Sequence, residues 1–199
     1  MKKITEGIQR RVILTDDPMR AKMLSAHHLE YSTLIYELGD IIVFSGSYNN
    51  VPIALASTGF GSGAVLSFLG ELKEHGAAEI IYLGGCVSTT DRHGLRAVIL
   101  ADGGDLGMCS RASETARKYE ISATIRTVLP PDGAYPEEGC IIDDITGAFY
   151  EQACADGVAA LSILTVSENA KTGEKMEEHE LRSRLYAASR LAFEVFAVS

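Results

Sequence analysis

The chain has 199 residues, of which 46% are hydrophobic, and a formal net charge of −9 at pH 7. The hydrophobic fraction argues against disorder, and the length predicts one domain spanning residues 1–199. Nonspecific nucleic-acid binding needs concentrated Lys and Arg, which this acidic chain does not offer. No apolar run reaches the roughly 20 residues that cross a bilayer. Because residues 1–6 also lack the apolar core of a signal peptide, we expect a cytoplasmic protein without membrane contact.

The cysteines are widely spaced, form no C-x-x-C pair and have no clustered histidines beside them: Cys86, Cys109, Cys140 and Cys154. This spacing predicts free thiols and no metal site. Nothing in the chain indicates a cofactor.

In chain order, the first segments alternate between strand and helix. An apolar strand at Arg11–Leu14 leads into a helix at Pro18–His27, whose proline stands at the first helical position. Two β-rich runs then flank the turn-forming pair Asn49-Asn50, which predicts a hairpin of Ile41–Ser47 and Val51–Ser57.

A glycine-rich turn at Gly59–Gly63 precedes a helix that extends to about Glu74, with apolar residues at helical spacing. The turn lacks the G-x-G-x-x-G spacing of a dinucleotide site, so we expect a tight turn that approaches a ligand closely. Two short buried strands follow, Ile80–Leu83 ending at Gly84-Gly85, and Ala97–Ala101.

The second half continues the alternation. The expected elements are helices at about Ser113–Tyr119 and Thr146–Ala155, strands at Ala123–Leu129 and Ala159–Val166, a loop at Pro130–Gly139, and an amphipathic C-terminal helix at Met176–Val198.

Helices interleaved with buried strands predict a three-layer α/β/α sandwich, and the early hairpin predicts a mixed central sheet. Ligands of such sheets bind beyond the carboxyl ends of the strands. Glycines at these ends allow close approach to the backbone, and acids supply chemistry. The predicted strand ends with these residue types are Asp16-Asp17, Thr58-Gly59, Gly84-Gly85 and Ser167-Glu168.

Taken together, the motifs resemble those of the purine/uridine nucleoside phosphorylases. The family's Gly-Asp-Pro-x-Arg turn corresponds to Asp16–Arg20, its hairpin to Phe44–Tyr48, and its Ser-Thr-Gly-x-Gly turn to Ser57–Gly61. Its apolar strand ending in glycine corresponds to Ile80–Gly84, and its closing Thr-Val-Ser-Asp to Thr165–Glu168. The resemblance covers nearly the whole chain in order. It implies a nucleoside-phosphorylase-like sandwich, assembly as a dimer or higher homo-oligomer, and phosphorolysis of a nucleoside to a base and ribose 1-phosphate.

The phosphate site that this resemblance implies keeps only part of its ligands. Asp16 stands where the family has the turn glycine, Tyr82 replaces an arginine, and Gly85 replaces a hydroxyl residue. The stretch Tyr31–Gly39, which in the family lends an arginine to the neighbouring subunit, contains none. A carboxylate about 4 Å from one phosphate charge repels it by roughly 4 kcal/mol at an effective dielectric of about 20, near a thousandfold in affinity. We therefore expect a degraded phosphate site, whose remaining anion-binding candidates are Arg20, Gly59, Gly84 and Gly85.

The same resemblance assigns the rest of the site. Glu168 takes the position of the family's aspartate and is the candidate general acid for the departing base, a role worth about 10²–10⁴ in rate; its alternative is a solvent-facing acid. Tyr135 and Phe60 are candidate contacts to the base. Asp143 and Asp144 either bind ribose hydroxyls or complement the dipole at a helix N-terminus.

Two functions remain open from the sequence. The first is an enzyme that cleaves the N-glycosidic bond of a nucleoside, by phosphorolysis or by hydrolysis, since water does not need the lost arginines. The second is a noncatalytic homologue that binds nucleosides or bases, or has a structural role. The two also differ in what Arg20 does: it either binds an anion or pairs internally with Asp16 or Asp17.

Overall fold

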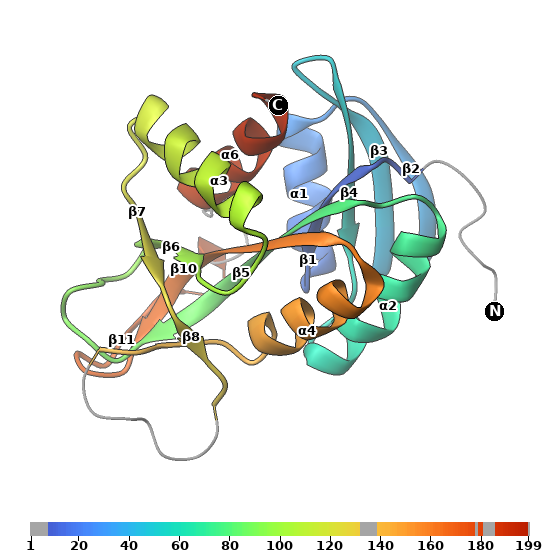
Figure 1. Cartoon of the computed structure of the whole chain (residues 1–199). Helices are drawn as coiled ribbons and strands as arrows, with labels where there is room; N and C mark the ends of the chain where they lie inside the picture. Colours follow the sequence, from blue (N-terminus) through green and yellow to red (C-terminus); the bar gives the residue numbers. More distant parts are fainter. Residues whose placement is uncertain (1–7, 132–138, 178, 181–185, 199) are drawn as a thin grey trace.

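The computed structural model describes residues 8–131, 139–177, 179–180 and 186–198. Within these ranges the strands form one mixed sheet of eleven strands (Figure 1). The main path runs β2-β3-β4-β1-β5-β10-β6-β7, with β9 beside β5, β8 beside β9 and β11 beside β10. The strands are β1 (Arg11–Thr15), β2 (Glu30–Leu38), β3 (Ile41–Tyr48), β4 (Val51–Ser57), β5 (Glu79–Ser88), β6 (Val98–Ala101), β7 (Ala123–Arg126), β8 (Val128–Leu129), β9 (Ile141–Ile142), β10 (Ala159–Asn169) and β11 (Glu174–Lys175).

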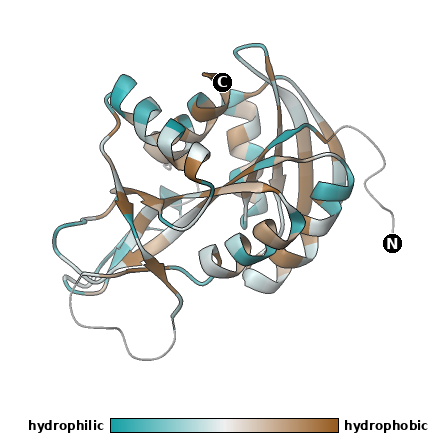
Figure 2. Cartoon of the chain, in the orientation of Figure 1, coloured by the Kyte–Doolittle hydropathy of each residue, from teal (hydrophilic) through white to brown (hydrophobic). Residues whose placement is uncertain are grey.

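Helices cover both faces of this sheet, which confirms the predicted three-layer sandwich (Figure 1). They are α1 (Pro18–His28), α2 (Ser62–Glu74), α3 (Leu106–Lys118), α4 (Thr146–Asp156) and α6 (Tyr186–Ala197). Apolar residues of α2 and α4 share one core with the sheet, and those of α1, α3 and α6 share the other. Figure 2 shows the same division, with hydrophobic strands inside and hydrophilic surfaces on the outer sides of helices.

The central strands are parallel and buried on both faces. β1 pairs in parallel with β4 and β5, and β5 pairs in parallel with β10. Strands in this position need side chains without polar groups on either face, which accounts for the unbroken run Val12–Leu14, fully buried in the structure. Their carboxyl ends therefore meet at one edge of the sheet.

The predicted hairpin is confirmed as β3 and β4, which pair antiparallel from Ile42 with Ser57 to Tyr48 with Val51. Both turn residues have positive φ, 50° at Asn49 and 63° at Asn50. This backbone matches the twist of the flanking strands, and asparagine tolerates it better than most residues.

Two strands are longer than predicted. β5 continues through Gly84-Gly85 to Ser88, and β10 continues through Ser167-Glu168 to Asn169. The expectation that both pairs follow the ends of their strands is therefore wrong. The reason is mutual pairing: β10 and β5 stay in register from Ala159 to Asn169, with one shift between Val166 and Glu168.

Other boundaries also differ. The expected start of the C-terminal helix at Met176 is wrong: residues 176–177 are not helical, and the Met176 amide donates to the Ser167 carbonyl oxygen at 2.8 Å, whereas residues 179–180 are helical and α6 begins at Tyr186. α3 begins at Leu106, where Asp105 caps it, instead of Ser113. The expected strand Ala123–Leu129 is divided into β7 and β8, which pair with different neighbours.

Strand β2 was not expected. It pairs antiparallel with β3 at the edge of the sheet, and its exposed positions hide the alternation by which a half-buried strand is usually found. Among the helices of the described ranges, none has the length and apolarity to cross a membrane.

Candidate functional site

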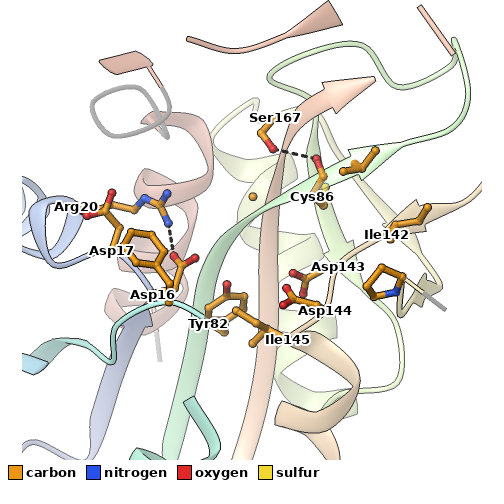
Figure 3. A pocket seen from close by; sticks show the side chains of 14 residues that line it. Asp16, Asp17, Arg20, Tyr82, Cys86, Ile142, Asp143, Asp144, Ile145 and Ser167 are labelled. Atoms are coloured by element: carbon orange, nitrogen blue, oxygen red, sulfur yellow. Dashed lines mark hydrogen bonds and ion pairs between the residues drawn. The ribbon is translucent and has the colours of Figure 1, made fainter. Parts of the chain in front are cut away.

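A cavity of about 490 Å³ opens where β1, β5 and β10 approach the N-termini of α1 and α4 (Figure 3). It is lined by Asp16, Asp17, Arg20, Phe60, Tyr82, Gly85, Cys86, Val87, Pro131, Ile142, Asp143, Asp144, Ile145 and Ser167. The ligand site was predicted beyond the carboxyl ends of the parallel strands, and a cavity large enough for a small-molecule ligand lies there. Its wall carries four carboxylates and, among the described lining residues, a single arginine.

The N-terminus of α1 faces this cavity and is already capped. The carboxylate of Asp17 accepts hydrogen bonds from the amides of Met19 at 2.8 Å and Arg20 at 3.4 Å. Pro18 supplies no amide at all. Free amides at a helix N-terminus attract anions, but here a side chain of the protein satisfies them.

Arg20 is also engaged by its own turn. It is 3% exposed, and its Nη1 donates to Asp16 Oδ1 at 2.8 Å, to Thr15 Oγ1 at 3.0 Å and to the Leu83 carbonyl oxygen at 3.5 Å. Of the two roles open for this arginine, the structure contains the internal ion pair with Asp16. The carboxylate lies beside the guanidinium at the cavity wall (Figure 3).

Tyr82 forms the inner wall of the cavity. Its side chain is 1% exposed and leans along β5 over Gly84, where an added Cβ would lie 2.5 Å from the phenolic oxygen. Burial, with the charges of Asp16 and Asp143 added, raises the pKa of this phenol well above its ordinary value. Tyr82 is therefore a neutral group that covers Gly84.

The two acids before α4 have different environments. Asp143 is 8% exposed, and its Oδ2 accepts from the amide of Thr146 at 2.8 Å and from its hydroxyl at 2.6 Å. Burial raises the pKa of this carboxyl, while the two hydrogen bonds act in the opposite direction. Asp144 is exposed and lines the cavity. Asp143 thus has the role of a helix N-terminal acid, and Asp144 is available to a ligand.

At the far side of the cavity, Ser167 donates to the Cys86 carbonyl oxygen at 3.1 Å across the two strands. Burial raises the pKa of the Cys86 thiol, so it lines the cavity as an uncharged group. Glu168 is not among the lining residues. Its carboxylate pairs with Lys175 Nζ at 2.9 Å, and its side chain is 33% exposed.

The structure therefore brings together a part of the predicted site. Arg20, Phe60, Gly85, Asp143 and Asp144 all line the cavity. The remaining candidates do not line it or lie outside the described residues: Gly59, whose missing Cβ would face Asp40; Gly84, covered by Tyr82; Glu168, paired with Lys175; and Tyr135, which belongs to the undescribed range 132–138.

Several lining residues were not predicted as site residues, among them Cys86, Ser167 and Ile145. Ser167 stands next to Glu168 in the sequence, and a regular strand would direct the two to opposite faces. The register shift between Val166 and Glu168 changes this alternation, and no pattern in the residues indicates such a shift.

No protein-family model matches the chain. The DeoD-type purine nucleoside phosphorylase of Bacillus velezensis is 26% identical over 212 aligned positions, which cover 91% of both chains. That of Alkaliphilus metalliredigens is 26% identical over 220 positions, with 94% of both chains covered. Among solved structures, the purine nucleoside phosphorylase of Toxoplasma gondii in complex with immucillin-H matches with a TM-score of 0.86 at 17% identity, over 100% of this chain and 96% of that one.

The architecture is thus that of a nucleoside phosphorylase: a mixed sheet between two helical layers, with a cavity at the carboxyl ends of the parallel strands. Over about nine-tenths of its length the chain is similar to DeoD-type purine nucleoside phosphorylases, the resemblance that its ordered motifs indicated.

Proposed function

We propose that this protein cleaves the N-glycosidic bond of a nucleoside with water as the nucleophile. The observation that carries the proposal is the hydrogen-bonded pair of Arg20 and Asp16, in a cavity whose other charged groups, among the lining residues that the structure describes, are carboxylates. A phosphate dianion has to displace Asp16 from Arg20 and approach the other acids. A neutral nucleoside and a neutral water meet no such repulsion.

In this reaction the water oxygen forms a bond to C1′ of the ribose as the bond from C1′ to the base nitrogen breaks. The electron pair of that bond goes to the base, which takes a proton from Glu168. Asp16, at the cavity wall beside Arg20, takes the proton that the water loses. The two carboxyl groups return to their starting states by proton exchange with solvent, so the products are the free base and ribose.

Other lining residues supply binding in this proposal. Asp144 accepts hydrogen bonds from ribose hydroxyls, because it is exposed to the cavity and Asp143 is occupied by Thr146. Phe60, which is 65% exposed, offers an aromatic face to the base.

The position of Glu168 requires one rearrangement. Its carboxylate must leave Lys175, whose side chain is 66% exposed. A surface ion pair of this kind contributes about 0–1 kcal/mol to stability. Breaking it therefore costs less than a correctly placed proton donor gains, because such a donor raises the reaction rate about 10²–10⁴-fold.

The experiment is incubation of the purified chain with purine and pyrimidine nucleosides, with and without phosphate, followed by chromatography of the bases. We expect base release that does not depend on phosphate. Release that requires phosphate would show phosphorolysis and overturn the hydrolytic mechanism. Glu168→Gln is expected to lower the rate about 10²–10⁴-fold. Glu174→Gln, which changes the same residue type on exposed strand β11, is the matched control.

The second candidate is a noncatalytic homologue, and the placement of Glu168 against Lys175 outside the cavity lining favours it. Base release in neither condition, together with a raised melting temperature in the presence of nucleoside, would support this role.

We also propose a cytoplasmic homo-oligomer. All four cysteines are free thiols. Edge strand β2 exposes large apolar side chains, with Tyr31 at 91%, Leu34 at 46% and Leu38 at 49%. An apolar sheet edge of this kind is a surface that a second copy covers, and light scattering of the purified chain tests it.

A further inference from the structure

A second and larger cavity, of about 690 Å³, lies at the side of the sheet where β6 and β7 meet α3 and α6. Its wall is made by residues 92–98 before and within β6, residues 119–122 between α3 and β7, Thr124 of β7, and two residues of α6, Ala187 and Arg190. It shares no lining residue with the first cavity. Its size is within the range of small-molecule sites.

The wall of this cavity is basic in a protein whose net charge is −9. It carries Arg92, Arg96 and Arg190 against one acid, Glu120. Arg96 pairs with Glu180. In the described part of the chain, neither Arg92 nor Arg190 has a carboxylate within ion-pair distance.

His93 adds a neutral donor. It is 7% exposed, and its Nε2 accepts from Arg126 Nε at 2.9 Å, so the proton of the neutral ring is on Nδ1. Burial and the neighbouring Arg126 and Arg92 lower the pKa of the imidazole. The second guanidinium contact of Arg126 is to the Ile125 carbonyl oxygen at 2.8 Å.

The remaining wall is apolar and aromatic. Leu95, Val98 and Ile121 line it, and the ring of Tyr119 lies 5.3 Å from the guanidinium carbon of Arg190. Such a contact holds the guanidinium in place by a cation–π interaction. A bare inorganic ion makes no use of this apolar surface, whereas a phosphate or carboxylate carried on a ring does.

The wall is also held in position by the sheet. Asn169 at the end of β10 donates from Nδ2 to the carbonyl oxygens of Thr90 at 2.9 Å and His93 at 3.1 Å. The Arg96 amide donates to the Val166 carbonyl oxygen at 2.9 Å. A site fixed in this way loses little freedom when a ligand binds.

We propose that this cavity is a second ligand site, which binds a small organic oxyanion through the guanidinium groups of Arg92 and Arg190 and packs its apolar or aromatic body against Tyr119 and Ile121. The proposal does not depend on the activity at the first cavity. Planar guanidinium groups favour phosphate or carboxylate through paired hydrogen bonds.

Isothermal titration of the full chain tests the site, with AMP, adenosine, benzoate and inorganic phosphate as probes. We expect AMP to bind, and adenosine and inorganic phosphate each to bind at least about tenfold more weakly than AMP. Benzoate tests whether a carboxylate on an aromatic ring is enough for binding. Arg92→Gln and Arg190→Gln are each expected to weaken AMP binding roughly tenfold. Arg117→Gln, on the exposed surface of α3 and outside both cavity walls, is the matched control and is expected to leave binding unchanged.

Absence of AMP binding at about 10 mM, or equal binding to wild type, Arg92→Gln and Arg190→Gln, would overturn the proposal. Binding that is altered by Asp144→Asn in the first cavity, and not by the arginine variants, would place AMP there and equally overturn it. Circular dichroism and the melting temperature of each variant separate loss of the site from loss of the fold. Equal affinity for inorganic phosphate and AMP would overturn the assignment of an organic ligand.

Discussion

Replacement of Asp16 by asparagine is expected to create phosphate affinity in the first cavity. The carboxylate lies 2.8 Å from Arg20 Nη1, so a phosphate oxygen that binds the same guanidinium lies roughly 4–5 Å from the carboxylate oxygen. One charge pair at about 4 Å costs roughly 4 kcal/mol at an effective dielectric of about 20, and about 2 kcal/mol if solvent at the partly exposed Asp16 doubles that dielectric. Removal of the charge therefore predicts an affinity gain of roughly 30- to 1,000-fold for inorganic phosphate.

Isothermal titration with phosphate at low ionic strength measures this gain. Asp144→Asn is the matched control, because it removes one carboxylate of the same cavity that makes no contact with Arg20 and is expected to give a smaller gain. An unchanged affinity in Asp16→Asn would refute the reasoning, as would an equal gain in the two variants. The readout does not involve catalysis, so it stands apart from the test of hydrolysis.

Three further predictions concern stability. Asp17→Ala removes the N-terminal cap of α1 and is expected to lower the free energy of unfolding by about 1 kcal/mol, measured by denaturant titration. An unchanged free energy of unfolding would show that the cap hydrogen bonds are not maintained. Gly84→Ala places a Cβ 2.5 Å from the Tyr82 phenolic oxygen and is expected to lower the free energy of unfolding by roughly 1–3 kcal/mol through overpacking. A melting temperature equal to that of the wild type would contradict this prediction. Burial lowers the pKa of His28 to about 4, below its ordinary value, so the unfolded chain binds the proton more readily and stability falls as the pH drops from about 6.5 toward 4. The loss at pH 5 is roughly 1–2 kcal/mol after a discount for partial solvent access. His28→Asn is expected to remove most of this pH dependence, and exposed His27→Asn, which takes away only the smaller charge contribution to the lowered pKa, is expected to reduce it less. Equal profiles of the two variants would contradict the assignment.

Local sequence rules predicted much of the scaffold, because the features concerned are set by neighbours in the chain. Asn49-Asn50 marked the hairpin through its turn preference, and Pro18 marked the start of α1. For Arg20 the sequence allowed either anion binding or an internal ion pair with Asp16 or Asp17, and the structure contains the pair with Asp16.

Other features depend on partners distant in sequence, and these were missed. Gly84 has the residue type of a strand end, but hydrogen bonding to β10 continues β5 past it. The direction of Ser167 follows from a register shift between two strands, which no single stretch of residues specifies. The exposed residues of β2 lack alternation because this edge strand has one sheet neighbour and little core contact.

The contact between Tyr82 and Gly84 also constrains how this chain can change over generations. Since the phenol lies where a methyl group at position 84 would be, a larger residue at 84 costs less stability once the residue at 82 has become smaller. The two positions are therefore epistatic, and the order of their substitutions matters. A lineage that gains a side chain at 84 without this loss of stability first passes through a sequence in which this aromatic wall has been lost.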